Sequence, residues 1–258
     1  MNLGIENKRA LVIGGGRGLG RGIAETLAKE GVTLTIAGRT ESKLADAAQL
    51  IAATGAMRPT ILACDVSKLE DIDRLIAAVK DTDILVNNCG GPPSKPLLDV
   101  NDQLWIDSFN SIFMSMMRLT RGFVGGMRER KWGRVLNIVS SGVIQPIPNL
   151  GISNSLRSAV CAWSKTLATE IASDGVTINC LAPGRIHTDR IDELDQTRAK
   201  HQGMEVGDVQ KASRAAIPAK RYGEVQEFAN MAAFLASDRA SYITGSIHRI
   251  DGGLISSV

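Results

Sequence analysis

The clearest chemistry-bearing stretch of the 258-residue chain is a cluster of glycines that directly follows a short apolar run at residues 10–13. The glycines are Gly14, Gly15, Gly16, Gly18 and Gly20. Glycines let a backbone turn sharply and approach a diphosphate, while free N–H groups and the helix dipole face the negative charge. An ordinary glycine-rich turn between a strand and a helix is the alternative. We expect a phosphate-binding loop, to which Arg17 adds a cation.

The end of the second apolar run indicates which cofactor such a loop serves. A dinucleotide fold that prefers NAD places Asp or Glu there, roughly 20 residues beyond the glycines, to bind the ribose hydroxyls. This chain has Gly38 and then Arg39 at that place. A guanidinium pairs with a 2′-phosphate in a fork, whereas a carboxylate repels it. The sequence therefore predicts NADP(H), with a solvated strand-end charge as the alternative for Arg39.

The elements that must position these residues alternate along the chain. Short apolar runs predict strands at 10–13, 32–37, 60–64, 83–87, 134–139, 176–181 and 246–250. Helical patterns follow the first glycines and recur at 41–53, 69–79, 112–130 and 156–173. This alternation predicts a parallel sheet covered on both faces. Because the chain has no linker or internal repeat, residues 1–258 are predicted to form one doubly wound α/β domain with seven strands.

Composition sets aside several other classes of protein. No stretch approaches the ~20 apolar residues of a membrane span, and no basic and apolar leader precedes the first strand. A net charge of +3 is too mild to argue for nucleic acid, and 4% aromatic residues offer little stacking surface. Cys64, Cys89, Cys161 and Cys180 show no close pairing and suit reduced thiols. We therefore predict a cytoplasmic protein without a membrane, nucleic-acid or metal partner.

Three stretches, residues 14–20, 87–90 and 179–188, carry patterns that belong together. They resemble the TGxxxGIG loop, the NNAG strand end and the NxxxPGxIxT segment of the short-chain dehydrogenase/reductase family. Ile13 stands in place of Thr in the first pattern and Cys89 in place of Ala in the second. Each motif alone is weak, but together and in order they are specific. The resemblance covers essentially the whole chain and implies a single Rossmann-fold domain with oxidoreductase activity.

The resemblance also implies which residues touch the cofactor. Asp65 and Val66 stand at the pair that contacts adenine, and residues 183–188 stand at the nicotinamide end. The predicted cofactor-binding set is Gly14, Gly16, Arg17, Gly18, Leu19, Gly20, Arg39, Asp65, Val66, Asn87, Asn88, Gly90, Arg157, Pro183, Gly184, Ile186 and Thr188. Residues 242–245 and 251–253 resemble the C-terminal segment that the family uses in packing and subunit contact.

The catalytic positions depart from the family pattern. Family members carry Ser, Tyr and Lys, and the last two are spaced YxxxK. The Tyr exchanges a proton with the substrate oxygen, and the Lys holds the nicotinamide ribose and lowers the pKa of the phenol. Here Ser140 stands at the serine, whereas Ser153 replaces Tyr and Arg157 replaces Lys. Tyr222 and Tyr242, the two tyrosines of the chain, belong to other segments.

These substitutions change the chemistry of the site. A serine hydroxyl is a much weaker acid than a phenol of pKa about 10, and a positioned acid contributes roughly 10²–10⁴ in rate. Arg157 can bind ribose hydroxyls and stabilise an oxyanion, but it is effectively never a proton donor. We predict that Ser140 and Ser153 hydrogen-bond a carbonyl oxygen while water or a substrate group supplies the proton. Asn110 stands at the family's proton-relay asparagine, and His187 is favoured as an exposed loop histidine.

Residues 184–218 are predicted to form a substrate lid, and residues 90–96 the opposite lip of the pocket. Basic and acidic side chains are interleaved along the lid, which favours a solvated, mobile helical pair. An acidic substrate held by Arg157 or Arg185 is the alternative interpretation.

Two functions stay open at this point. The first is an NADP(H)-dependent oxidoreductase that interconverts a carbonyl and an alcohol on a small or acyl substrate. Many chains with this resemblance are labelled 3-oxoacyl-carrier-protein reductases, a name that rests on fold similarity. The second is an NADP(H)-binding protein without turnover, acting as a sensor or scaffold. The apolar segments 112–130 and 156–173 carry more hydrophobic surface than one sheet face covers, so we also predict a homotetramer.

Overall fold

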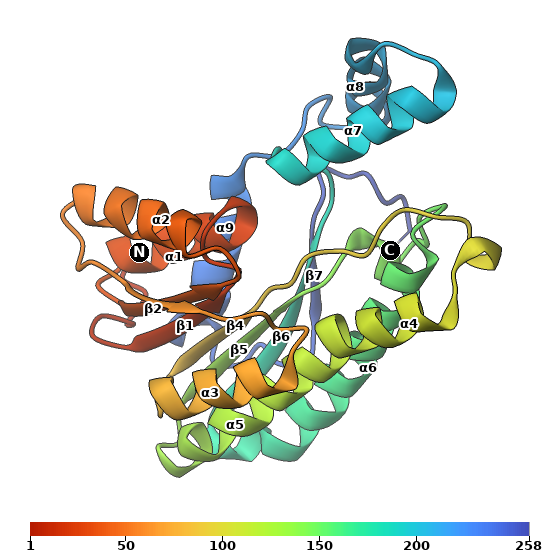
Figure 1. The fold of residues 1–258 in the computed structure, drawn as a ribbon. Helices are drawn as coiled ribbons and strands as arrows, with labels where there is room; N and C mark the ends of the chain where they lie inside the picture. Colours follow the sequence, from red (N-terminus) through yellow and green to blue (C-terminus); the bar gives the residue numbers. More distant parts are fainter. Residues whose placement is uncertain (258) are drawn as a thin grey trace.

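The computed structural model describes residues 1–257, and its central feature is a seven-stranded sheet in the order β3-β2-β1-β4-β5-β6-β7 (Figure 1). The strands are β1 (Arg9–Ile13), β2 (Thr33–Gly38), β3 (Thr60–Ala63), β4 (Ile84–Asn87), β5 (Gly133–Ile138), β6 (Val176–Pro183) and β7 (Ile247–Ile250). All adjacent strands are parallel. The predicted doubly wound α/β fold is therefore confirmed.

Helices cover both faces of this sheet. They are α1 (Gly18–Lys29), α2 (Glu41–Ala53), α3 (Leu69–Val79), α4 (Asp102–Phe109), α5 (Ser115–Glu129), α6 (Gly151–Ile171), α7 (Asp189–Gln202), α8 (Val206–Ala216) and α9 (Val225–Leu235). Ala10 and Val12 of β1 point to a core shared with α1, α2 and α9. Leu11 and Ile13 point to the opposite core, shared with α3, α5 and α6. Because both faces are buried, the strands are continuous apolar runs instead of alternating ones.

The two long apolar helices begin earlier than their sequence patterns predict. The segment predicted at 112–130 is α5 with most of a π-helical turn over Asn110–Met114, and α4 leads directly into that turn. Asn101 caps α4, because its Oδ1 accepts a hydrogen bond from the Leu104 N–H at 2.9 Å. The helix predicted at 156–173 begins at Gly151, where the buried Ile152 already packs in a third apolar cluster. Polar residues in these first turns hide the helical period.

The order of the strands reverses between β1 and β4. From β1 the chain proceeds to β2 and β3 on one side, and from β4 it proceeds to β5, β6 and β7 on the other. Open parallel sheets bind ligands outside the carboxyl ends of the strands at such a reversal. Strand β6 reaches Pro183, beyond its predicted end, because it pairs with β7 as far as Ile250. The carboxyl edge of the sheet is therefore the place to search for a site.

Helices α7 and α8 stand apart from the two layers that cover the sheet (Figure 1). They form most of residues 184–218, the segment that we call the lid. The lid lies beyond the carboxyl ends of the strands, so it is placed to cover a site there. Within residues 1–257, none of the helices combines the length and the apolar character needed to cross a membrane.

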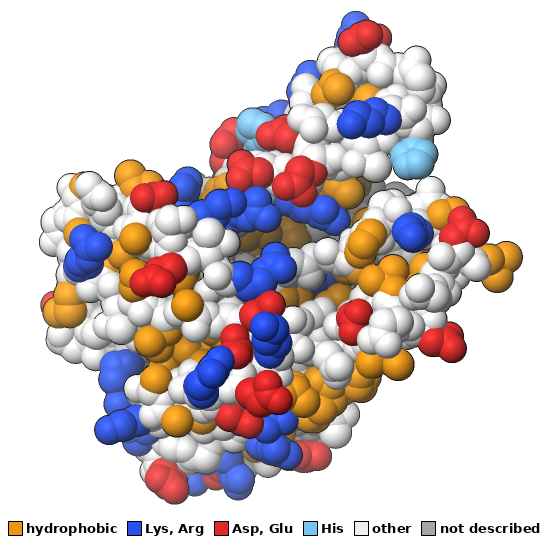
Figure 2. Space-filling model, viewed as in Figure 1, with side chains coloured by type: hydrophobic (Ala, Val, Ile, Leu, Met, Phe, Trp, Pro, Cys, Tyr) orange, Lys and Arg blue, Asp and Glu red, His pale blue; other side chains and the backbone are white. Residues whose placement is uncertain are grey.

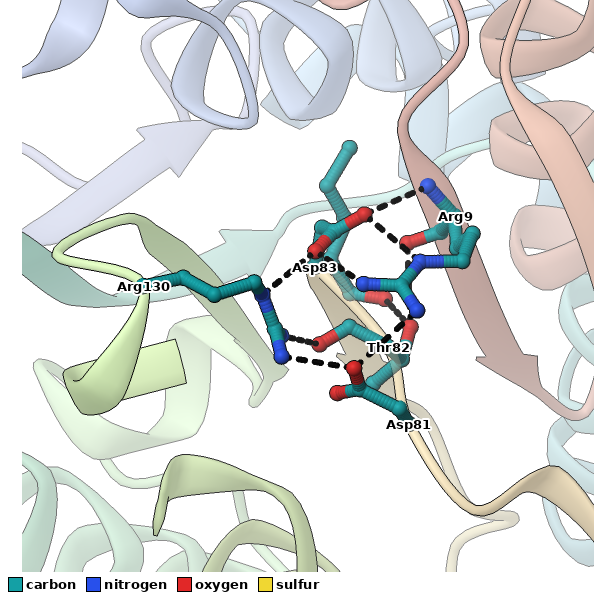
Figure 3. A network of polar contacts seen from close by, with 6 residues as sticks. Arg9, Asp81, Thr82, Asp83 and Arg130 are labelled. Carbon is teal, nitrogen blue, oxygen red and sulfur yellow. Dashed lines mark hydrogen bonds and ion pairs between the residues drawn. The ribbon is translucent and has the colours of Figure 1, made fainter. Parts of the chain in front are cut away.

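The amino end of the sheet is closed by a network of ion pairs (Figure 3). Arg9 of β1 donates to the Asp83 carboxylate from Nη2 at 2.8 Å and from Nε at 3.0 Å, and its Nη1 lies 3.0 Å from Asp81 Oδ2. Arg130 donates from Nη1 to Asp81 Oδ2 at 2.6 Å and from Nη2 to the Thr82 carbonyl at 3.0 Å. These contacts join β1, the residues before β4 and the end of α5.

Candidate cofactor and substrate site

A cavity of about 760 Å³ opens at the carboxyl edge of the sheet, between the strand ends and the lid. Figure 2 shows the hollow, with apolar side chains inside it and Lys and Arg side chains along its rim. The predicted site residues on its wall are Gly14, Gly16, Arg17, Gly18, Leu19, Arg39, Val66, Asn88, Gly90, Ser140, Ser153, Arg157, Pro183, Gly184, Ile186 and Thr188. The cavity is of the size that encloses a small-molecule ligand. It brings most of the predicted residues together.

The glycine loop is shaped by positions that exclude a side chain. Gly14 has a φ of +69°, in the left-handed region that favours glycine. A Cβ on Gly20 would lie 2.3 Å from the Gly14 carbonyl oxygen, so Gly20 serves close packing and lies behind the wall. Arg17 is the N-cap of α1, and no side chain caps the first turn. The free N–H groups of that turn suit a phosphate.

Cations gather where β2 ends. Gly38, Arg39 and Thr40 lie on the cavity wall, and Lys43 joins them from the first turn of α2. No motif of the sequence singled out Lys43. Its place in the first turn of the helix predicted at 41–53, directly after Arg39, is the signal that would have found it. Two cations at this strand end fit a 2′-phosphate better than either would alone.

Two predicted cofactor residues, Asn87 and Asp65, are not among the wall residues. Asn87 is buried, and its Nδ2 donates to Asn137 Oδ1 at 2.8 Å and to Thr120 Oγ1 at 3.0 Å. It therefore ties β4 to β5 and α5. The Asp65 carboxylate accepts hydrogen bonds from the Ser67 N–H and hydroxyl in the turn before α3. Both side chains therefore have hydrogen-bond partners within the chain, and their contact with the cofactor stays a prediction.

Ser140, Ser153 and Arg157 share the cavity wall, as the sequence predicts. Ser140 follows β5, and its Oγ accepts a hydrogen bond from the Gly142 N–H at 3.1 Å, which leaves the hydroxyl proton free to donate. Ser153 is 7% exposed in the first turn of α6, and Arg157, one turn later, is 6% exposed. Residues four apart on a helix lie side by side. The cavity therefore receives two hydroxyl donors and a guanidinium.

Two backbone carbonyls hold the Arg157 guanidinium in place. Nη1 donates to the Ile138 carbonyl at 2.6 Å, and Nη2 donates to the Cys89 carbonyl at 3.2 Å. These carbonyls belong to the end of β5 and to the residues just past β4. Burial raises the pKa of the Cys89 thiol and outweighs the nearby Arg157 charge, which lowers it. The Cys89 thiol therefore stays neutral near pH 7 and offers Arg157 no counter-charge.

The guanidinium of Arg185 is compensated within the lid. Its Nη1 donates to Asp195 Oδ1 at 2.7 Å, and Asp195 is fully buried. Tyr222 Oη donates to Asp195 Oδ2, also at 2.7 Å. Burial, together with this carboxylate, raises the pKa of Tyr222. Tyr222 thus belongs to the base of the lid and Tyr242 is fully exposed, so that no tyrosine among residues 1–257 lies on the wall.

Two further candidates are not among the wall residues. Asn110, for which we predicted a catalytic contact, opens the π-helical turn and is not part of the wall. A π-helical turn holds more residues than an α-helical one, and this shifts the faces of the neighbouring residues in a way that sequence spacing does not reveal. His187 is exposed, with its Nε2 3.5 Å from Asp192 Oδ1. That position agrees with the loop histidine that the sequence favours.

Part of the wall comes from residues outside the predicted cofactor-binding and catalytic sets. Arg190, Ile191 and Leu194 of α7 belong to the predicted lid, whereas no motif connected the other wall residues with the site, namely Gln145, Pro146, Ile147, Pro148 and Leu150 before α6 and Leu254 and Ile255 near the C-terminus. Most of them are apolar, so this end of the cavity suits a hydrophobic portion of a ligand. Only the two closely spaced prolines gave a signal in the sequence, that of a rigid loop. The C-terminal residues gave none.

A glycine loop at the reversal point of a doubly wound sheet is the arrangement of dinucleotide-binding proteins. A family model described as enoyl-(acyl carrier protein) reductase matches residues 14–255. The chain belongs to the short-chain dehydrogenase/reductase family, whose members among its relatives are oxidoreductases. The family that the sequence motifs suggest is thereby confirmed.

Curated relatives and solved structures match the chain over nearly all of its length. The 3-oxoacyl-[acyl-carrier-protein] reductase FabG of Escherichia coli is 34% identical over 255 residues, which are 98% of this chain and 99% of that one. The FabG of Haemophilus influenzae is 36% identical over 257 residues, 97% and 99% of the two chains. L-sorbose reductase from Gluconobacter frateurii, in complex with NADPH and L-sorbose, has a TM-score of 0.94 at 32% identity and full coverage of both chains. YwfH, an NADPH-dependent reductase of bacilysin biosynthesis, has a TM-score of 0.93 at 28% identity, with 98% and 100% covered.

Proposed function

We propose that the chain is an NADP(H)-dependent oxidoreductase that interconverts a carbonyl and an alcohol on a small or acyl substrate. One observation carries the proposal: a single cavity joins the glycine loop and Arg39 to Ser140, Ser153 and Arg157. A cofactor-binding end and a substrate-polarising end in one enclosed space are what hydride transfer requires. The relatives are named as reductases, as is the NADPH-bound structural neighbour, which supports the same conclusion.

NADP(H) is the cofactor that the wall residues fit. The glycine loop and the first turn of α1 would hold the diphosphate, and Arg39 with Lys43 would hold the 2′-phosphate. The nicotinamide end would lie against the segment after β6, at Pro183, Gly184, Ile186 and Thr188. When bound, this group supplies or accepts a hydride.

The protein's own side chains orient the substrate and stabilise its oxygen. The Ser140 and Ser153 hydroxyls donate hydrogen bonds to that oxygen. Arg157 stabilises the negative charge that develops on it when a carbonyl is reduced. A serine hydroxyl and a guanidinium are both poor proton donors near neutral pH, so water or a group of the substrate supplies the proton. In the direction of alcohol oxidation the proton leaves by the same route.

A second candidate is an NADP(H)-binding protein without turnover. The cavity wall formed by the described residues includes no tyrosine and no histidine that would serve as a general acid. This observation favours the candidate without turnover. The two candidates separate in one experiment. NADPH binding is measured by fluorescence, and NADPH oxidation is followed by absorbance over a panel of carbonyl compounds. Turnover of any member of the panel supports the enzyme.

Tight NADPH binding without any turnover supports the second candidate instead. The double variant Ser153→Tyr with Arg157→Lys then provides the control, because it restores the family's YxxxK spacing. If the wild type is silent and the double variant reduces simple ketones, the substitutions at these two positions abolished an ancestral activity. If the wild type is active, the double variant shows how its rate compares with the Tyr-based chemistry.

We also propose a cytoplasmic homotetramer. The four cysteines are free thiols, which suits a reducing compartment. Phe109 of α4 stacks on Phe113 of the π-helical turn, Phe113 meets Trp163 of α6 edge to face, and Phe109 and Ile106 remain 41% and 53% exposed. Such an apolar face suits an isologous contact with a second copy. Light scattering at micromolar concentration is expected to give the mass of four 27.5 kDa chains, and a monomer would refute the assembly.

A further inference from the structure

Arg157 is a buried cation whose position is set by the protein. Only 6% of the residue is exposed, and the guanidinium donates to the Ile138 and Cys89 carbonyls at 2.6 and 3.2 Å. A guanidinium has five N–H donors, so these two bonds leave others unused. Because Arg157 lies on the wall of the cavity, the unused donors are available to a molecule inside it.

No protein carboxylate neutralises this charge. Within residues 1–257, Arg157 has no carboxylate oxygen within 4.0 Å, and the same holds for Arg39 and Lys43. Arg39 and Lys43 are exposed, so water screens them. A buried cation without an anion is costly, and the cost persists in a folded protein only when a partner completes the site.

The charged groups of the cofactor would have other partners than Arg157. They would lie at the glycine loop after β1 and at Arg39 and Lys43 after β2. Arg157 is held between the ends of β4 and β5, on the other side of β1 in the sheet. Strands are spaced by about 4.8 Å, so roughly three strand widths separate Arg39 from Arg157. The nicotinamide ribose is uncharged, and its hydroxyls would leave the guanidinium charge uncompensated.

We propose that the substrate is an organic anion, a short oxo acid whose carboxylate pairs with Arg157. This inference rests on the proposed function. Ser153 and Arg157 are neighbours on one face of α6, which places the carbonyl oxygen within one or two carbons of the carboxylate. The apolar wall residues Pro146, Ile147, Leu150, Leu254 and Ile255 receive the rest of the molecule. Arg185 does not serve as the anion site, because Asp195 already pairs with it at 2.7 Å.

Binding of phenylpyruvate and of its methyl ester to the NADP⁺-saturated protein tests this proposal. The two probes share a ketone and an apolar ring and differ in the carboxylate charge and one methyl group, and the oxidised cofactor prevents turnover. Titration calorimetry of the wild type is expected to show the acid binding at least about tenfold more tightly than the ester, since hydrogen bonds to charged groups are strong. Arg157→Gln is expected to abolish the difference, and Arg157→Lys to keep much of it.

Lys165→Gln is the matched control, because it removes one positive charge from the same helix at an exposed position outside the cavity wall. It is expected to keep the preference for the acid. If Arg157→Gln does not fold, Arg157→Met takes its place, since it fills a similar volume without a charge to bury. Equal affinity of the wild type for acid and ester overturns the proposal, and so does a preference that survives in Arg157→Gln or Arg157→Met.

The result is distinguishable from a failure of the proposed function. If the protein oxidises NADPH with neutral ketones but shows no preference for the acid, the oxidoreductase assignment stands and the anionic substrate is wrong. If the acid preference depends on Arg157 while no carbonyl compound is turned over, the anion site stands and the enzymatic assignment is wrong.

Discussion

The two ends of the sheet differ in how completely their charged side chains are paired. At the amino end, Arg9, Arg130, Asp81 and Asp83 pair with one another over distances of 2.6 to 3.2 Å (Figure 3). At the carboxyl end, Arg17, Arg185 and Arg190 have carboxylate partners in the lid, but three other wall cations, Arg39, Lys43 and Arg157, have none in the described part of the chain. Charges that the protein pairs internally hold the fold together. Charges that it leaves unpaired along a cavity are available to a ligand.

Two buried arginines, one at each end of β5, show the same contrast between paired and unpaired charges. Arg134, at the start of β5, is 2% exposed, and it donates to the carbonyls of Ser237 at 3.1 Å, Gly133 at 2.8 Å and Gly175 at 3.3 Å, with Asp238 3.8 Å away. Arg157 donates to two carbonyls, but it faces the cavity and has no carboxylate nearby. Arg134 thus has its partners within the chain, whereas part of Arg157 remains available to a ligand in the cavity. That difference separates a structural residue from a functional one.

The largest effect is expected at Arg157, which has no carboxylate partner. Arg157→Ala should lower kcat/KM by about 10²–10³-fold, the range for loss of one oxyanion-stabilising donor, and should weaken NADPH binding as well. Its stability should change little, because a buried unpaired charge is removed together with its hydrogen bonds. Steady-state kinetics, cofactor titration and thermal melting measure the three quantities. A kcat/KM within a few-fold of the wild type would mean that Arg157 lies outside the reaction, and that the two ends of the sheet differ less than proposed.

At the amino end of the sheet we expect the opposite pattern, a loss of stability without a loss of activity. Asp83→Ala leaves Arg9 without its main partner and should lower the free energy of unfolding by about 3 kcal/mol, near the lower end for a broken buried pair, because Arg9 itself is partly exposed. Activity per folded molecule should be unchanged. Urea unfolding measures the first, and kinetics at low temperature measures the second. Lost activity in the fully folded variant would contradict the division of roles.

The pH dependence of stability sharpens this test. Burial alone would raise the pKa of Asp83, but the hydrogen bonds and charge of Arg9, with Arg130, outweigh it and hold the pKa below its ordinary value. The stabilisation is therefore complete above the unfolded-state pKa of about 4 and is lost as the pH falls through the lower folded-state value. The stability difference between the wild type and Asp83→Ala should shrink over that acidic range. A difference that is independent of pH would exclude the ion pair as its source.

The next effect concerns cofactor choice at the exposed cations. Arg39→Ala should lose about 10- to 100-fold of the preference for NADPH over NADH, which corresponds to roughly 1.5–3 kcal/mol for hydrogen bonds to a charged group. NADH affinity should stay the same, because NADH lacks the 2′-phosphate. Lys43→Ala should give a smaller loss in the same direction. Titration of both reduced cofactors measures the preference, and tighter binding of NADH by the wild type would contradict the assignment.

The smallest effect is expected at Ser153. Ser153→Ala removes one neutral hydrogen bond, worth about 1 kcal/mol, and should lower turnover about fivefold. Ser140→Ala should have a similar effect, and Ser153→Tyr alone should not restore ordinary reductase activity without a lysine beside it. Single-turnover rates with saturating NADPH measure these changes. If activity is indifferent to loss of both serines, the polarising groups lie elsewhere, and His187 becomes the next residue to replace.

The local patterns of the sequence determined the framework of this protein. Apolar runs, helical periodicity and glycine positions predicted the seven strands, the phosphate-binding loop and Arg39 after β2. These features are predictable because the backbone conformation of each short segment depends on the residues within it. The motifs carried the prediction further, to Ser140, Ser153 and Arg157 on one wall. Helix starts were less predictable, since a cap such as Asn101 and the polar first turns interrupt the apolar period.

Only the tertiary structure decided which charges are compensated and which side chains reach the cavity. Arg157 and Arg185 are equivalent candidates in the sequence, yet Asp195 neutralises one of them and two carbonyls merely hold the other. Asn87 matched a cofactor motif, but its neighbours take its side chain into the interior. Leu254 reaches the wall from the end of the chain. Burial, compensation of charge and cavity lining all depend on residues far apart in sequence, and no local pattern records which of them come together.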